Sequence, residues 1–190
     1  MKTQTIIALK FLAIMTVLTG IIYPLFVTAI SRSVFPYQSK GSLIVKDGKI
    51  IGSELIGQKF DSCIYFWSRP SAVDYNPLPS GGSNYGPTSV KLQKIVIDKR
   101  HTFDSANYVS ASNTPSEMIT ASASGLDPHI SPKSAYMQVE RVSKSRGFSE
   151  KQKKELKGLI AQLSEYPQFH LFGEDRINVL KLNIELDKIK

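Results

Sequence analysis

An uncharged, apolar run near the start of the chain is the clearest pattern in the sequence. Residues 11–31 read FLAIMTVLTGIIYPLFVTAIS and lie between Lys10 and Arg32. A helix of that length rises about 31 Å, which matches the hydrocarbon core of a bilayer. The pattern predicts a transmembrane helix over residues 11–31, preceded by a short cytoplasmic tail of residues 1–10.

Two other interpretations of this run stay open. A cleaved signal peptide has an apolar region of about 7–15 residues before a small-residue cleavage site. Ala29-Ile30-Ser31 is a weak match to such a site, although the run is longer than a signal peptide needs. A buried helix of a soluble protein is the third interpretation. The length of the run favours an uncleaved membrane anchor.

The charges around this run do not decide its orientation, because Lys10 precedes it and Arg32 follows it. Long C-terminal domains can cross a membrane largely regardless of charge. We therefore expect a cytoplasmic N-terminus, a linker at 32–41 and an extracytoplasmic domain at 42–190.

The first part of that domain mixes strand and loop signals. Two apolar segments flank Asp47-Gly48, a pair typical of the two-residue turn in a β-hairpin. The aromatic run 64–67 predicts a short buried strand, with Cys63 beside it as a small buried residue. Residues 70–87 are rich in proline and glycine and predict a long irregular loop.

Helix signals dominate the rest of the domain. Ser131 is suited to cap a helix that Gly147 ends, and Ser149 with Gln152 has the spacing of a capping box. Further helices are predicted over two segments, at 88–101 and 115–125. Strands are predicted over two others, at 106–110 and at the alternating residues 180–186.

These patterns define the expected fold class. It is a single N-terminal transmembrane helix followed by one mixed α/β (α+β) soluble domain. The chain has 24 Lys+Arg and 16 Asp+Glu, with six of the basic residues between 144 and 157. That segment is expected to be the solvated face of two helices, because nucleic-acid binding favours interleaved aromatic residues. No nucleic-acid partner is expected.

The sequence has few motifs typical of catalysis or of ligand binding. Gly81 and Gly86 have the spacing of a phosphate-binding loop, but Pro87 stands where that loop needs lysine. Asp127 and His129 have the residue types of a general acid/base pair. Asp before proline, however, more often initiates a turn. The single cysteine excludes an intramolecular disulfide and multi-cysteine metal sites. No catalytic set and no metal site is predicted, which favours an accessory subunit over an enzyme.

Five sequence strings carry a family resemblance. They resemble, in the family's order, the C subunit of the Kdp potassium-transporting ATPase of bacteria. The strings are YFWSRPSA (65–72), SGGSNYGP (80–87), TASASGLDPHISP (120–132), QVERV (138–142) and RINVLKLN (176–183). The lysine-rich stretch 151–157 departs from the expected family pattern.

The resemblance implies a non-catalytic accessory subunit of a high-affinity, ATP-driven potassium uptake pump in the bacterial plasma (inner) membrane. It implies a channel-like potassium-binding subunit, a P-type ATPase subunit and a small membrane subunit as partners, besides the lipid bilayer. ATP and potassium are then handled by those partners. This chain is expected to support assembly and to act as a catalytic chaperone that raises the ATP affinity of the P-type ATPase subunit.

The alternative is a membrane-anchored hydrolase that uses Asp127, His129 and a nearby serine. If the chain is an accessory subunit, the residues expected to contact a partner are those in the predicted loops or in the motifs that carry the resemblance. They are Trp67, Arg69, Gly81, Gly82, Asn84, Gly86, Asp127, His129 and Asn178. We expect loop 70–87 or 120–132 to face the partner and the basic segment 144–157 to point away from the pore.

Overall fold

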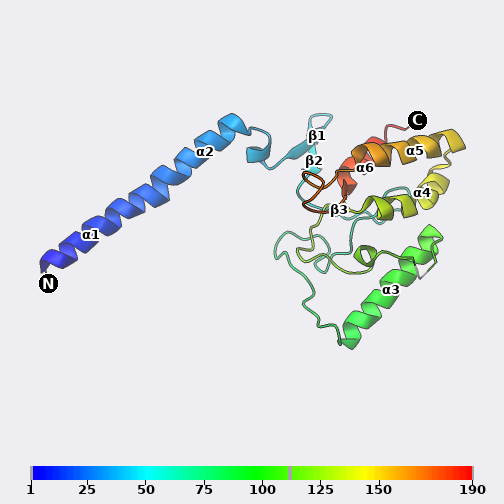
Figure 1. Ribbon diagram of the computed structural model, residues 1–190, viewed down its shortest axis with the longest axis horizontal. Coiled ribbons are helices and arrows are strands. Elements are labelled where there is room, and N and C mark those ends of the chain that lie inside the picture. Colours follow the sequence, from blue (N-terminus) through cyan, green and yellow to red (C-terminus); the bar gives the residue numbers. More distant parts are fainter. Residues whose placement is uncertain (1, 111–112, 190) are drawn as a thin grey trace. The chain divides into compact units, whose positions relative to one another are not determined.

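The computed structural model describes residues 2–110 and 113–189 (Figure 1). It divides into two compact units, with the boundary between Ile51 and Gly52. The first unit holds the apolar helix and most of a hairpin, and the second holds the folded domain.

The apolar run forms one continuous helical segment. It consists of α1 (Lys2–Val17), a π-helical turn at Leu18–Ile22 and α2 (Tyr23–Val34). The turn has a local cause, because Pro24 has no amide hydrogen and its ring crowds the preceding turn. The amide of Tyr23 accordingly donates to the carbonyl of Leu18, five residues back.

This segment is long and apolar enough to cross a membrane, and it is the one such helix in the described part of the chain. None of its most apolar window is buried, unlike a helix in the core of a soluble protein. The helix extends beyond residues 11–31 at both ends, and the residues that lie in the bilayer stay a prediction.

The predicted hairpin is confirmed. Strands β1 (Leu43–Lys46) and β2 (Lys49–Ser53) pair across a turn at Asp47-Gly48, after a short 3-10 turn at Gln38–Lys40. Both turn residues have positive φ, 51° and 75°, as a type I′ turn requires.

The second unit is mainly helical. Its regular elements are α3 (Val90–Asn107), η3 (Ser116–Met118), β3 (His129–Ile130), α4 (Pro132–Arg146), α5 (Glu150–Leu163), β4 (Ile177–Asn178) and α6 (Val179–Leu186). Helix α4 packs against α3 and α5, and α5 packs against α6 (Figure 1). Strands β3 and β4 pair antiparallel, with Ile130 opposite Ile177.

One apolar core lies between these elements, and it includes the aromatic residue Phe66. Its most deeply buried large side chains are Phe66, Phe103, Ile130, Val139, Val142, Leu156, Ile160, Ile177, Leu182 and Leu186. The expected class, one N-terminal apolar helix and a mixed domain, is confirmed.

The helix signals around α4 and α5 are also confirmed. Ser131 Oγ accepts a hydrogen bond from the amide of Ser134, and Gly147 ends α4 with a φ of 66°. Ser149 and Gln152 form a complete capping box at the start of α5. The basic segment 144–157 lies at the end of α4 and along α5, largely exposed as expected.

The strand predicted at 106–110 is wrong. The helix predicted at 88–101 is present as α3, but it continues through Ala106 and Asn107. Tyr108 then ends it in the left-handed conformation, with φ 57°. Asn107 is buried against the domain, so tertiary packing extends the helix past its weakly helical sequence.

The helix predicted at 115–125 is reduced to the single 3-10 turn at Ser116–Met118. Beyond that turn, the amide of Ser122 donates to the carbonyl of Pro70 at 3.0 Å. The segment therefore binds another loop instead of continuing its own helix.

The strand predicted at 180–186 is also wrong, because these residues belong to α6. Val179, Leu182, Asn183 and Leu186 are buried at spacings of three and four residues, which places them on one helical face. The alternating pattern favours a strand, but packing against α5 selects the helix.

Residues 64–67 do not form the predicted strand. The chain turns there, with the amide of Tyr65 donating to the carbonyl of Ser62 at 3.2 Å. Cys63 lies on this turn and is exposed, contrary to the expectation that it is buried.

Candidate partner-binding site

Side-chain amides take the place of a strand partner for the aromatic segment. Asn183 accepts from the amide of Phe66 at 2.8 Å and donates to its carbonyl at 3.0 Å. Gln138 accepts from the amide of Trp67 at 2.7 Å and donates to its carbonyl at 3.3 Å. Side chains of α4 and α6 thus make the hydrogen bonds that a neighbouring strand would otherwise make to the backbone of this buried segment.

Arg141 fixes the turn before this segment. Its guanidinium donates to the carbonyls of Cys63 and Tyr65 at 2.6 and 2.9 Å, and to Asn107 Oδ1 at 2.9 Å. It also donates to Gln138 Oε1 at 2.8 Å. Arg141 is only 3% exposed, and its burial lowers its pKa to about 10, so it remains charged at neutral pH.

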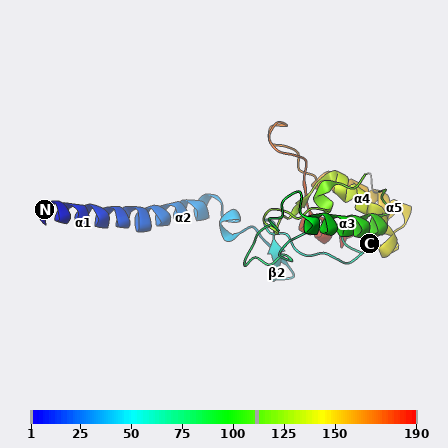
Figure 2. The same cartoon turned by 90° about the horizontal axis from the view of Figure 1, so that it is seen from below.

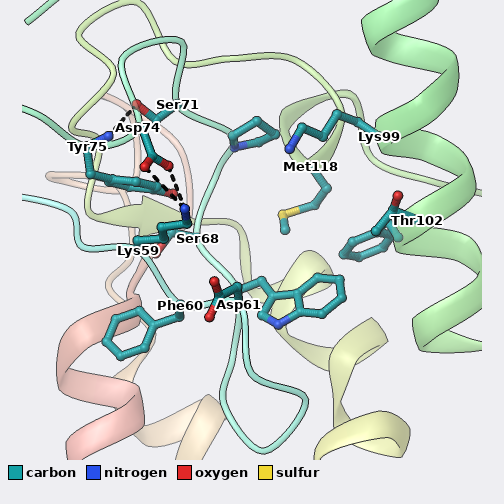
Figure 3. A pocket seen from close by; sticks show the side chains of 13 residues that line it. Lys59, Phe60, Asp61, Ser68, Ser71, Asp74, Tyr75, Lys99, Thr102 and Met118 are labelled. Carbon is teal, nitrogen blue, oxygen red and sulfur yellow. Dashed lines mark hydrogen bonds and ion pairs between the residues drawn. The ribbon is translucent and has the colours of Figure 1, made fainter.

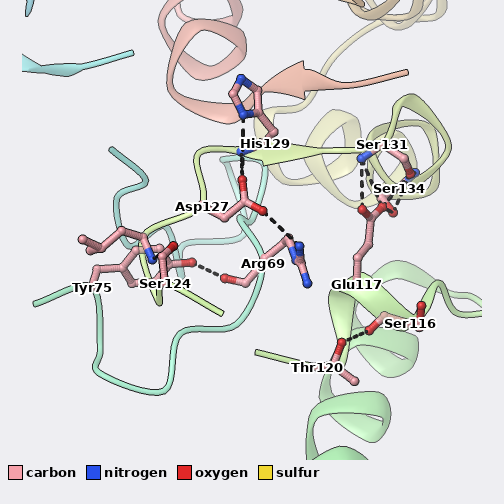
Figure 4. A network of polar contacts seen from close by, with 11 residues as sticks. Arg69, Tyr75, Ser116, Glu117, Thr120, Ser124, Asp127, His129, Ser131 and Ser134 are labelled. Atoms are coloured by element: carbon pink, nitrogen blue, oxygen red, sulfur yellow. Dashed lines mark hydrogen bonds and ion pairs between the residues drawn. The ribbon is translucent and has the colours of Figure 1, made fainter. Parts of the chain in front are cut away.

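A second group of polar contacts joins the two loop motifs (Figure 4). Arg69 Nη1 lies 3.0 Å from Asp127 Oδ2, with about a quarter of each side chain exposed. The Tyr75 hydroxyl donates to the carbonyl of Arg69. Burial raises the pKa of Tyr75 to about 12, so this hydroxyl keeps its proton. Loops far apart in sequence are thereby held together.

Asp127 also shapes its own turn, because its Oδ1 accepts a hydrogen bond from the amide of His129 at 3.0 Å. The His129 ring is less tightly held, with Nδ1 3.8 Å from the same oxygen. Burial, with Arg176 as a further cause, lowers the pKa of His129 below its ordinary value of 6.5. The ring is therefore neutral at pH 7.

The contacts of two nearby serines, Ser131 and Ser134, do not match the hydrolase alternative. Ser131 and Ser134 both donate their hydroxyls to Glu117, which binds the start of α4 (Figure 4). A serine nucleophile needs its base within hydrogen-bond reach. In the described chain, neither of these serines makes such a contact with His129.

Glycines allow the loops to pack backbone against backbone. Gly125 has φ +70°, and a Cβ there would lie 2.6 Å from Val73 Cγ2 and 3.0 Å from the Gly81 carbonyl oxygen. A Cβ on Gly82 would lie 3.3 Å from the Ala123 carbonyl oxygen. We call residues 69–87 and 120–129 together the loop surface.

The predicted site residues therefore fall into three groups. Arg69, Asp127 and His129 meet directly, and Gly81 and Gly82 pack against the loop that contains Asp127. Asn84 and Gly86 lie at the exposed end of the loop. Two further candidates lie outside the loop surface, Trp67 and Asn178.

Asn178 has an internal role. Its side chain is buried, accepts from the amide of Lys181 at 3.1 Å and donates to the carbonyl of Glu54 at 2.8 Å. It caps α6 and holds the segment after β2. Any contact of Asn178 with a partner stays a prediction.

Cavities flank the loop surface. One, of about 240 Å³, lies beside Trp67, Tyr75 and Phe103, and the Lys59–Asp74 ion pair stands at its side (Figure 3). Another, of about 520 Å³, is lined on one side by the Arg69, Asp127 and His129 group and on the other by residues 166–168 and 172–176. No cluster of three or more metal-ligating side chains occurs in the described residues.

Sequence reasoning missed the buried polar residues Gln138, Arg141 and Asn183. A partial signal was present, because Gln138 and Asn183 each stand between two apolar neighbours in the chain and Arg141 precedes the apolar Val142. All three lie on the buried faces of their helices. A buried charge or amide at such a position needs internal partners. The sequence alone does not identify those partners as backbone groups of residues 63–67.

Comparison with known proteins identifies the family. The KdpC family model, described as "K+-transporting ATPase, c chain", matches residues 5–188. The chain is 47% identical over 186 residues to the potassium-transporting ATPase KdpC subunit of Geotalea uraniireducens, covering 96% of each chain. It is 44% identical over 192 residues to that of Dechloromonas aromatica, covering 100% of this chain and 99% of the relative. The family that the sequence motifs predicted is confirmed, and the chain belongs to the KdpC family.

Proposed function

We propose that this chain, as an accessory subunit of a potassium-transporting ATPase, uses its loop surface to dock on a channel-like subunit of the complex. The observation that carries the proposal is the joining of loops 69–87 and 120–129 into one ordered surface. The Arg69–Asp127 ion pair and glycine packing hold this surface, and exposed residues such as Asn84 project from it.

The proposal places the domain outside the cytoplasm, with the chain held by its N-terminal helix in the bacterial plasma membrane. When the domain binds at the outer mouth of a channel-like subunit, it changes the ATP affinity of the complex indirectly. The effect is a coupling free energy that is transmitted through the assembly. A chaperone role in this sense predicts weaker ATP binding by the complex when this chain is removed.

Steric blocking tests the docking surface. A Cβ on Gly86 meets no atom within 4 Å, and Gly86 is exposed. We therefore expect Gly86→Trp to place a bulky ring on the loop surface without unfolding the domain, which thermal unfolding of the variant checks. Gly158→Trp on α5 is the matched control, because this glycine is also exposed and unobstructed. We expect Gly86→Trp, but not Gly158→Trp, to reduce co-purification with the other pump subunits. Equal co-purification of both variants contradicts the proposal.

Thiol labelling in intact cells tests the orientation. Cys63 is exposed, so it is first replaced by serine to remove background labelling. A cysteine introduced by Lys154→Cys on α5 is expected to react with an impermeant reagent before lysis. Labelling only after lysis places the domain in the cytoplasm and rejects this part of the proposal.

A further inference from the structure

Residues 165–176 form a narrow hairpin that extends from the end of α5. It is the orange segment that projects from the second unit in Figure 2. The backbones of Glu165 and Arg176 exchange hydrogen bonds of 2.8 and 3.0 Å, and their side chains pair at 2.9 Å. Gln168 and Phe172 exchange two further backbone bonds of 2.9 and 3.0 Å. The hairpin is therefore preformed, and we call it the arm.

The end of the arm, residues 166–172, is apolar and exposed to solvent, and we call it the tip. Its large apolar side chains are Tyr166, Phe169, Leu171 and Phe172, which are 67%, 84%, 79% and 67% exposed. Scattered single apolar residues on a surface need no explanation, but a cluster on one projecting element marks an interaction site. Burial of these four side chains needs a surface outside the described residues.

The geometry of the turn at the end of the arm does not explain why apolar residues stand there. Phe169 and His170 both have positive φ, 55° and 57°, at the tip. Such a turn favours asparagine and glycine, which tolerate the left-handed region. A bulky aromatic residue there adds backbone cost without a folding benefit, so its side chain points to a binding role.

Charge distinguishes a protein partner from lipid. The arm carries Glu165, Glu174 and Asp175 against one arginine, Arg176, which is paired with Glu165. Elements that bind the membrane surface are rich in lysine and arginine, which attract anionic lipid. An acidic arm with an apolar tip instead complements an apolar recess with a basic rim on a protein.

The arm is continuous with the loop surface. Residues 166–168 and 172–176 of the arm and the Arg69, Asp127 and His129 group line the same cavity of about 520 Å³. A partner surface that covers both the arm and this cavity would contact the polar group as well. Because the family model describes one chain of a K+-transporting ATPase, the other chains of such a complex are the protein partners considered for the arm.

We propose that the arm inserts its tip into an apolar, basic-rimmed recess of another subunit of the potassium-transporting ATPase. This inference rests on the proposed function, and it assigns the hydrophobic part of the interface to residues 166–172. The loop surface then supplies the polar part.

Binding of the full chain to the detergent-solubilised complex prepared without it tests the arm. The variant combines Phe169→Ser, Leu171→Ser and Phe172→Ser. The control combines Val90→Ser and Ile97→Ser on α3, where both side chains are also exposed. We expect the arm variant to bind about tenfold more weakly or worse, and the control within about twofold of wild type. Unchanged thermal unfolding of the arm variant excludes misfolding.

A photo-crosslinking residue in place of Phe169 identifies what the tip contacts in the assembled complex. A cross-link to another pump subunit supports the proposal. Cross-links only to lipid, or only to a second copy of this chain, overturn it. If the wild-type chain binds and the arm variant binds equally well, the proposed role of the arm is wrong but the proposed function stands. If wild type itself does not bind the complex, the proposed function fails.

Discussion

The guanidinium carbon of Arg141 lies 4.2 Å from the centre of the Trp67 ring. A cation over an indole face is a favourable contact, and the same guanidinium donates to carbonyls of the preceding turn. Arg141 therefore sets both the path of the chain before Trp67 and the position of its ring. Through Trp67, this buried residue positions one wall of the cavity beside the loop surface.

Arg141→Met is expected to lower the free energy of unfolding by about 2–3 kcal/mol, because it leaves several buried hydrogen-bond partners unsatisfied. Lys133→Met on the same helix is the control, since Lys133 is exposed. Unfolding of the full chain in detergent is followed by the fluorescence of Trp67, its single tryptophan. Equal stability of the two variants contradicts the structural role of Arg141.

Asn183→Leu is expected to cost about 2 kcal/mol of stability. Leucine fills a similar volume but leaves both the amide and the carbonyl of Phe66 without their partner. Gln162→Leu, at an exposed position on α5, is expected to change stability by less than about 0.5 kcal/mol. Chemical denaturation of both variants measures the difference, and a neutral Asn183→Leu rejects the amide pairing.

His129 is expected to make stability depend on pH. Its pKa is lowered in the folded chain, so the unfolded chain binds the proton more readily. The contribution of neutral His129 is complete above about pH 6.5 and is lost as the pH falls below that value. His129→Gln is expected to flatten this part of the stability profile between pH 7.5 and 5, whereas His101→Gln, at an exposed position, leaves it unchanged. Identical profiles for both variants contradict this assignment.

Gly125→Ala is expected to destabilise the domain by about 2 kcal/mol. Alanine at a φ of +70° is strained, and its Cβ meets Val73 and the backbone of Gly81. Gly86→Ala has no such contact and is expected to be close to neutral. Thermal unfolding of both variants checks the prediction. Failure of Gly125→Ala to lower the midpoint means that the two loops are not closely packed.

Signals that act between neighbours in the chain were readable from the sequence. The uncharged run 11–31, the Asp47-Gly48 turn, and the caps Ser131 and Ser149 depend on residues a few positions apart. The family is carried by contiguous motifs, and therefore it was also readable. Asp127 and Arg69 were predicted as site residues, but not as an ion pair.

Tertiary structure decided whatever depends on partners distant in sequence. The alternation of residues 180–186 favours a strand by pattern, but burial of Leu182 and Leu186 against the core selects the helix. The backbone of Phe66 finds its partner in Asn183, 117 positions away, and no local pattern encodes that choice. Exposure of the arm likewise depends on the core leaving residues 166–172 uncovered, because composition alone does not separate buried from exposed apolar residues.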